Sequence, residues 1–169
     1  MKFAGHFIGF LSIAATIISS AHSEDKNYDL SNKNQFTFYF KENWETIFNT
    51  PQPVANPAKE RIGQLLASDM YFQPCFTVER LSGNRYFRVR FWGMSHALIN
   101  CHVDSSVVLP RDPEDNSIHS NMEMEFIQNT TCKSYTNSLH KIAMDIKARK
   151  TDANDPYRIY KIVEHCARD

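Results

Sequence analysis

The first 23 residues constrain the fold of this chain most strongly. Lys2 precedes an apolar run over residues 3–18, and the small residues Ala21 and Ser23 occupy the −3 and −1 positions of a signal-peptidase site. This pattern predicts a cleaved leader, with an uncleaved N-terminal anchor as the alternative. Cleavage leaves about 146 of the 169 residues, which is the usual size of one domain that folds outside the cytoplasm.

The cysteines all lie beyond this leader. An even number of cysteines in an exported chain predicts two disulfides, formed by Cys75, Cys101, Cys132 and Cys166. Three pairings are open. We favour Cys132 with Cys166 and Cys75 with Cys101, because the first pair would bracket two predicted C-terminal helices. No C-x-x-C or H-E-x-x-H spacing occurs, so we expect neither a metal site nor a cofactor.

Charge and composition narrow the classes of partner. The chain has 19 basic and 19 acidic residues, and this balance argues against a general nucleic-acid binder. Aromatic residues make up 12% of the chain, which favours a packed domain. After the leader, no stretch approaches the roughly 18 apolar residues of a membrane span. We expect a flexible polar arm over residues 24–35 and one disulfide-linked domain over residues 36–169.

Hydrophobic periodicity divides the first half of this domain into alternating elements. Residues 36–40 alternate between phenylalanine and other residues, which predicts a short strand, and helical spacing follows from Trp44. Asn56 and Pro57 form a helix start, with a capping side chain before a proline at the first helical position. Residues 72–94 predict a β-hairpin around the turn at residues 82–84.

The second half reads as two strands followed by two helices. Alternation predicts strands over residues 97–108 and 122–126, separated by an acidic loop. Residues 139–146 and 155–166 then show apolar residues at helical spacing. Together these elements predict an α+β domain with a curved antiparallel sheet of about three to five strands and helices packed on one face. NTF2-like and cystatin-like domains have such an arrangement.

A candidate binding surface lies on the second strand of the predicted hairpin. There two arginines alternate with other residues between two aromatic side chains, in the row Tyr86, Arg88, Arg90 and Trp92. Guanidinium groups pair with carboxylate or phosphate, and aromatic faces stack on flat groups, so the row could hold an anionic partner. In the alternative interpretation, the arginines form cross-strand pairs with Glu79, Glu123 or Glu125, and Trp92 lies under a helix.

No local motif identifies a catalytic centre, and we assign no catalytic residue. His102 and Asp104 share one face of a predicted strand, so a hydrolase that uses His102 with Asp104 or with Glu123 remains an alternative. No G-x-S-x-G motif supplies a nucleophile. Residues 129–131 form one N-glycosylation sequon.

Two segments, residues 81–91 (LSGNRYFRVRF) and residues 38–44 (FYFKENW) with Phe48, carry short patterns of a known family. The first looks like the strand pair "L-x-G-x-Y-x-W-x-V" and the second is similar to the helix entry "Y-F-x-x-x-G-W-x-x-F" of the IcmL/DotI-like periplasmic domains of bacterial type IV secretion systems. The glycine before the tryptophan is absent here, and the four cysteines and a longer C-terminal part are further departures. The resemblance implies an NTF2-like, non-catalytic assembly or virulence-associated domain in the periplasm.

These observations predict a secreted or periplasmic, non-catalytic domain that binds another macromolecule, either a protein or an anionic ligand. A small secreted hydrolase and a secreted enzyme inhibitor are the alternatives.

Overall fold

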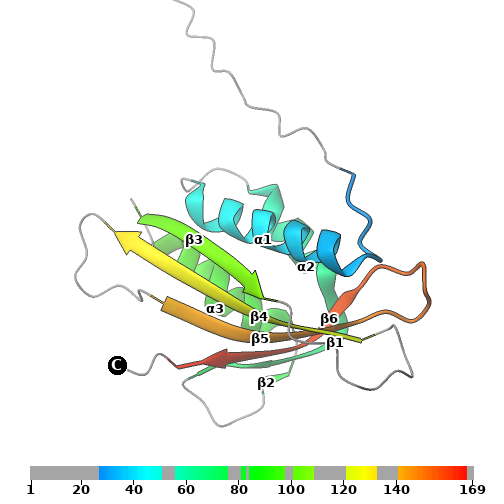
Figure 1. Cartoon of the computed structure of the whole chain (residues 1–169). Helices are drawn as coiled ribbons and strands as arrows, with labels where there is room; N and C mark the ends of the chain where they lie inside the picture. Colours follow the sequence, from blue (N-terminus) through cyan, green and yellow to red (C-terminus); the bar gives the residue numbers. More distant parts are fainter. Residues whose placement is uncertain are drawn as a thin grey trace, which may run out of the picture.

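A curved six-stranded sheet wraps around the helices in the computed structural model, which describes residues 27–50, 56–75, 81–82, 84–97, 101–108, 121–132 and 141–166 (Figure 1). The predicted leader lies outside these residues, as do residues 76–80 and 83 of the predicted hairpin. The elements run in the order α1 (Lys33–Asn49), α2 (Pro57–Leu65), β1 (Leu66–Gln73), β2 (Leu81–Ser82), α3 (Asn84–Ala97), β3 (Cys101–Val108), β4 (Asn121–Cys132), β5 (Lys141–Arg149) and β6 (Arg158–His165). No helix of the described part of the chain is long and apolar enough to cross a membrane.

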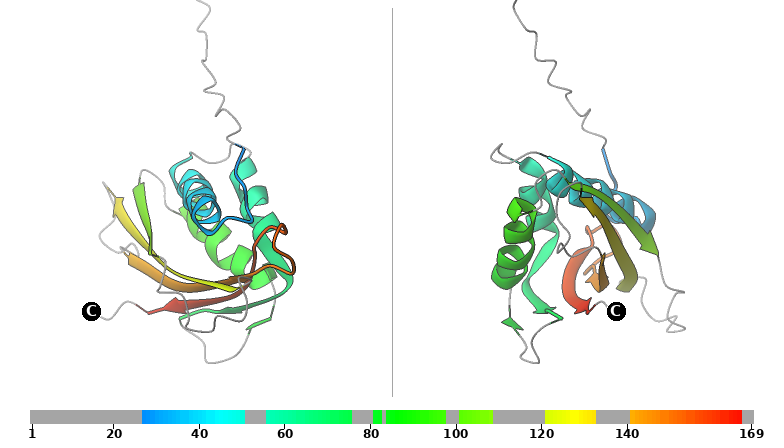
Figure 2. Two further views of the ribbon diagram at one scale, coloured as in Figure 1. Left: turned by 45° about the vertical axis from the view of Figure 1, so that its right-hand side comes forward. Right: turned by 90° about the vertical axis from the view of Figure 1, so that its left-hand side faces the viewer.

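The strand order is β2-β1-β6-β5-β4-β3, and the helices lie on the concave side of the sheet (Figure 2). This arrangement confirms the predicted α+β class with a curved sheet and helices on one face. The sheet is larger than expected, and it is not wholly antiparallel, because β1 runs parallel to β6. Through that pairing the first long strand of the chain lies beside the last strand.

α1 corrects the strand predicted for residues 36–40. Phe36 and Phe40 are fully buried, whereas Phe38 between them is 62% exposed. The apolar positions therefore follow helical i, i+4 spacing, and the alternation of phenylalanines does not mark one buried face. The helix begins after Asn32, whose Oδ1 accepts hydrogen bonds from the backbone N–H groups of residues 34 and 35.

α3 corrects the second strand of the predicted hairpin for the same reason. Phe87 and Phe91 are fully buried, and Val89 is 68% exposed. Because residues i and i+4 share a face in a helix and also in a strand, only the exposure of the intervening residue separates the two structures.

β5 and β6 correct the two predicted C-terminal helices. In β5 the inward residues alternate strictly, with Met144 buried between Ile142 and Ile146. In β6 a register shift places Lys161 opposite Lys147 and Ile159 opposite Ala148. The extra residue at this bulge places the inward side chains of Ile159 and Ile162 three residues apart, which imitates helical spacing.

Other sequence predictions are confirmed. α2 begins at Pro57, after an asparagine whose Oδ1 accepts a hydrogen bond from the N–H of Ala58 at 3.1 Å. β3 occupies residues 101–108 of the strand predicted over residues 97–108, whereas Ala97 is the last residue of α3. β4 shows the predicted alternation, with Met122, Met124 and Phe126 facing inward.

α1 covers the exposed edge of β3 with side-chain hydrogen bonds. Asn49 Oδ1 accepts from Val103 N at 2.8 Å, and Asn49 Nδ2 donates to Val103 O at 2.9 Å. One turn earlier, Glu45 Oε1 accepts from Ser105 N at 2.9 Å and pairs with Lys41 at 3.1 Å. These side chains occupy the backbone groups of an edge strand that would otherwise be open to another chain.

We expect Asn49→Ala to lower the free energy of unfolding by about 1–3 kcal/mol, because the N–H and C=O of Val103 both lose their partner. Urea denaturation followed by circular dichroism measures this change. Asn121→Ala is the matched control, since it removes the same amide from an exposed position on β4. Equal stability of the two variants would show that α1 does not protect this edge.

Candidate functional site

The four residues of the predicted binding row lie on α3, which distributes them over different faces of the helix. Tyr86 and Arg88 are exposed, and Arg90 and Trp92 are partly buried. The Trp92 ring packs against the core and lies 5.8 Å from the ring of Phe87. The single strand face that the sequence predicted therefore does not form.

Arg90 pairs with a buried carboxylate on β6. Its Nη2 lies 2.7 Å from Glu164 Oε1 and its Nε donates to Glu164 Oε2 at 3.2 Å, which makes the pair bidentate. The Glu164 side chain is only 2% exposed, and the Arg90 side chain is 24% exposed. The alternative interpretation that the arginines form ion pairs is thus right for Arg90, although its partner comes from β6 and not from the predicted glutamates.

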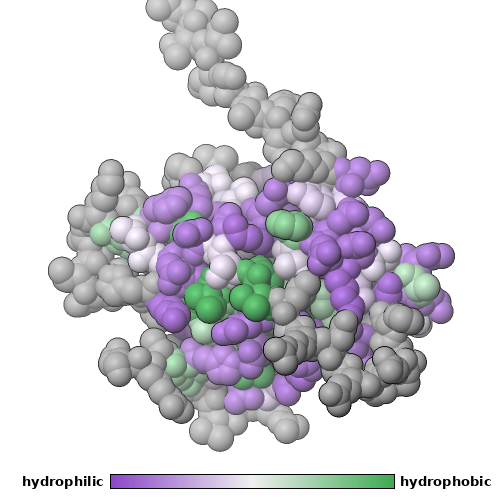
Figure 3. Space-filling view, viewed as in Figure 1, coloured by the Kyte–Doolittle hydropathy of each residue, from purple (hydrophilic) through white to green (hydrophobic). Residues whose placement is uncertain are grey.

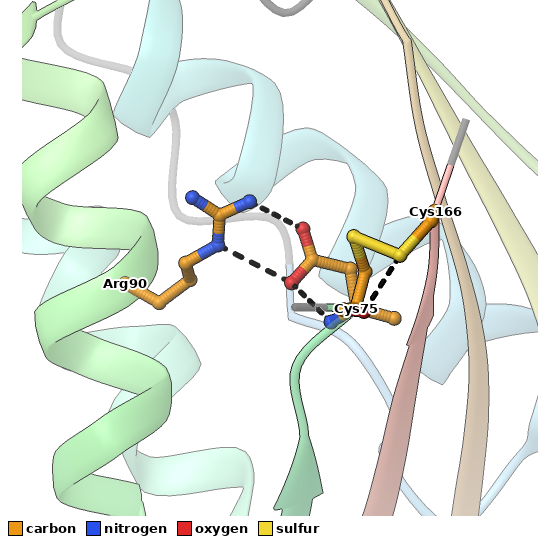
Figure 4. A network of polar contacts seen from close by, with 4 residues as sticks. Cys75, Arg90 and Cys166 are labelled. Atoms are coloured by element: carbon orange, nitrogen blue, oxygen red, sulfur yellow. Dashed lines mark hydrogen bonds and ion pairs between the residues drawn. A yellow bond between two sulfur atoms is a disulfide. The ribbon is translucent and has the colours of Figure 1, made fainter. Parts of the chain in front are cut away.

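This ion pair adjoins one of the two disulfides. Figure 4 shows Arg90 extending from α3 toward the bond between Cys75 and Cys166. The N–H of Cys75 donates to Glu164 Oε2 at 3.4 Å, so the same carboxylate contacts α3 and the end of β1. The disulfide and the ion pair together fix α3, β1 and β6 at this end of the sheet.

The observed disulfides differ from the favoured pairing. Cys75 is bonded to Cys166, and Cys101 is bonded to Cys132. Cys101 and Cys132 are register partners of β3 and β4, and β1 and β6 are parallel neighbours whose ends lie together. The favoured disulfide pairing depended on two predicted C-terminal helices. The observed pairing requires β5 and β6, the strands that these segments form instead.

The outward face of α3 carries two of the large hydrophobic side chains that are exposed in the described residues. Tyr86 is 46% exposed and Val89, three residues later, is 68% exposed. Arg85 and Arg88 are exposed beside them. Arg88 also lies against α2, where a Cβ added to Gly63 would come within 2.6 Å of Arg88 Nη2. We define these four residues, Arg85, Tyr86, Arg88 and Val89, as the α3 surface.

The interior between the helices and the sheet is filled by aromatic rings. Trp44 is fully buried, and its ring lies between 5.1 and 5.9 Å from five phenylalanine rings, those of Phe40, Phe48, Phe87, Phe91 and Phe126. Its Nε1 donates to Gln128 Oε1 at 2.7 Å, and Gln128 Nε2 donates to Thr130 Oγ1 at 3.2 Å. These polar groups satisfy one another in the core, so they offer no accessible acid or base.

The candidate catalytic residues lie outside this interior, on exposed positions of the sheet. His102 and Asp104 are exposed on the outer face of the edge strand β3, and Glu123 is paired with Lys147 on the adjacent part of the sheet. Another histidine, His165, pairs with Asp145 on the outer face. Within the described residues, no group of three or more histidine, cysteine, aspartate or glutamate side chains could hold a metal ion.

The outer face of the sheet is mainly hydrophilic, with a small apolar area near its middle (Figure 3). Val108, which ends β3, is 52% exposed. An open depression of about 460 Å³ lies at one end of the sheet, between the start of β1, the end of β5 and the start of β6. No local sequence pattern marks this depression, because its residues lie in three separate segments of the chain.

Comparison with solved structures places the fold among NTF2-like and cystatin-like domains. A cystatin-like domain of unknown function from Nostoc punctiforme superposes with a TM-score of 0.55 at 8% identity, over 82% of this chain and 79% of that one. An NTF2-like protein of unknown function from Pseudomonas putida gives 0.53 at 7% identity, over 85% and 92% of the two chains. A proposed ketosteroid isomerase from Parabacteroides distasonis gives 0.52 at 12% identity, over 81% and 89%.

A fourth similar structure is a proposed calcium/calmodulin-dependent protein kinase type II association domain from Thiobacillus denitrificans. It has a TM-score of 0.55 and 11% identity, over 81% of this chain and 96% of that one. No family model and no curated protein sequence matches this chain. At such low identities the likeness defines the fold and leaves the activity open. The strand pair that suggested IcmL/DotI-like domains consists here of β2 and part of α3.

We expect Arg90→Met to lower the free energy of unfolding by about 3 kcal/mol, because it leaves Glu164 buried without a counter-charge. Arg85→Met is the matched control on the same helix, and it should change stability by less than about 0.5 kcal/mol. The double variant Arg90→Met and Glu164→Met should regain most of the loss. If Arg90→Met is as stable as the control, the ion pair is not a structural element of the domain.

Proposed function

We propose that this protein is an exported, disulfide-linked, non-catalytic domain that binds an acidic protein through the α3 surface. The observation that carries the proposal is the exposure of Tyr86 and Val89 one helical turn apart, beside two exposed arginines. Exposed apolar side chains with a charged rim are typical of protein interaction sites, and tyrosine and arginine supply much of the energy of such interfaces.

The charges of the α3 surface favour an acidic partner. Among the described residues neither Arg85 nor Arg88 forms an ion pair, and the one hydrogen bond of Arg88 goes to the carbonyl of Gly63 at 3.5 Å. Two guanidinium groups without a carboxylate can pair with carboxylates of another protein, which steers association and fixes its orientation. This retains Arg88 and Tyr86 from the sequence prediction and assigns Arg90 and Trp92 to the support of the helix.

A non-catalytic role is supported by the filled interior. NTF2-like neighbours include a proposed isomerase and a proposed association domain, so the fold serves both catalysis and assembly. Here Trp44 and its neighbouring rings occupy the space between α1, α3 and the sheet, and the histidines of the described residues lie on exposed positions. A binding role of this kind agrees with the assembly function that the IcmL/DotI-like resemblance implies.

Capture experiments with the mature protein test the α3 surface. We expect Tyr86→Ser with Val89→Ser to abolish capture of a protein from the exported fraction of the source cells, without a change in the melting temperature. Phe38→Ser is the matched control, because Phe38 is an exposed aromatic residue on another helix, 62% exposed against 46% for Tyr86. Capture by the control should persist and should weaken as salt is raised. Identical capture by both variants would exclude this surface.

Export is supported by the leader pattern and by the two cysteine pairs at bonding distance. We expect the intact mass of the protein from its source to lack the first 23 residues and to rise by about 4 Da on reduction, two hydrogens for each disulfide. Peptide mapping should link Cys75 to Cys166 and Cys101 to Cys132. A full-length product with free thiols would contradict export.

A further inference from the structure

Two arginines face each other across the β5–β6 pair at the end of the sheet. Arg149, the last residue of β5, is the register partner of Arg158, the first residue of β6. Like charges directly opposite each other on neighbouring strands destabilise the pairing. A bound anion that contacts both guanidinium groups therefore stabilises a pair of this kind, because it relieves the repulsion between the two charges.

The protein itself neutralises the charges of these two arginines only weakly. Arg149 pairs with Asp69 at 2.6 Å, but the two side chains are 49% and 63% exposed. An ion pair this exposed contributes little to stability, so a ligand can compete with Asp69 for the guanidinium. Among the described residues Arg158 has no ion-pair partner, and its Nη1 donates to the backbone carbonyl of Gln64.

A third cation stands beside the pair. Lys150 donates to the carbonyl oxygens of Ser31 at 3.0 Å and Ala153 at 2.7 Å, and its Nζ lies 5.0 Å from the centre of the Tyr157 ring. These contacts hold the ammonium group in place without a carboxylate at ion-pair distance in the described part of the chain. Part of its charge is offset by Asp29, whose carboxyl pKa is lowered first by hydrogen bonds from Ser31 and also by the charge of Lys150, and the rest adds to the charge of the two arginines.

All three cations line the open depression at this end of the sheet. Its volume is about 460 Å³, and the hydroxyl-bearing residues Ser68 and Thr151 line it together with one carboxylate, Asp155. Asp155 Oδ2 already accepts a hydrogen bond from the N–H of Asp152 at 3.1 Å. A volume of this size is within the range that holds a small organic molecule and exceeds what a bare oxyanion needs.

We propose that this depression is a binding site for a small molecule that carries a terminal phosphate or sulfate group. The two guanidinium groups contact the oxyanion, since their planar donors match tetrahedral oxyanions in a bidentate way. Lys150 adds a point charge, and the hydroxyls of Ser68 and Thr151 are donors for the body of the ligand. The site lies on β1, β5 and β6, and it is separate from the α3 surface.

Titration of the mature protein with glucose 6-phosphate, glucose 6-sulfate and glucose at low salt tests this site. We expect saturable amide shifts in NMR spectra at Ser68, Thr151 and Arg158 with the first two probes and none with glucose. A preference for the phosphate or for the sulfate would identify which group the site recognises. Absence of saturable shifts with both charged probes would overturn the proposal.

Variants separate this site from general charge effects. Arg149→Gln and Arg158→Gln should each weaken binding at least about tenfold, because each removes charge-assisted hydrogen bonds to the oxyanion. Lys141→Gln is the matched control, since it removes one positive charge from the exposed opposite end of β5. Arg158→Lys keeps the charge and loses the bidentate geometry, so it should bind more weakly than the unaltered protein. Equal weakening in the Lys141 control would overturn the proposal, because binding would then depend on overall charge only.

Discussion

The burial of Trp44 is the constraint on which the rest of this structure depends. Its ring contacts phenylalanines from α1, α3 and β4, and its Nε1 donates to Gln128 in the core. A large ring with one polar group can be fully buried only where that group has a partner. The position of Gln128 on β4 therefore fixes how α1 lies across the sheet, and α3 packs against the same ring.

Disulfides and polar side-chain contacts at the edges and ends of the sheet hold it in place around Trp44. One disulfide joins the ends of β1 and β6, the other joins β3 to β4, and Asn49 of α1 occupies the open edge of β3. Arg90 and Glu164 bind α3 to β6 beside the first disulfide. With the frame fixed in this way, the exposed groups of α3 and the cations at the end of β5 and β6 are available for binding.

The sequence predicted part of this arrangement. The cap at Asn56 and the alternation in β4 were readable, because each depends on neighbouring residues. The α+β class with a curved sheet was also predicted correctly, although several elements were assigned to the wrong type. The identity of α1, α3 and β5 was not, since residues four apart share a face in both a helix and a strand. In β6 the bulge near Tyr160 imitated a helix, and the preference for a wrong disulfide pairing followed from it.

The sequence by itself determined the composition of the core and the number of cysteines. It also showed that arginines alternate with aromatic and apolar residues over residues 85–92. Only the tertiary structure decided which arginine pairs with a buried carboxylate and which is exposed, because Glu164 is 74 residues away from Arg90 in the chain. It also decided that Arg149 and Arg158 face each other, since that contact depends on the β5–β6 register. Local periodicity is a property of short segments, whereas the pairing of charges depends on how distant segments pack.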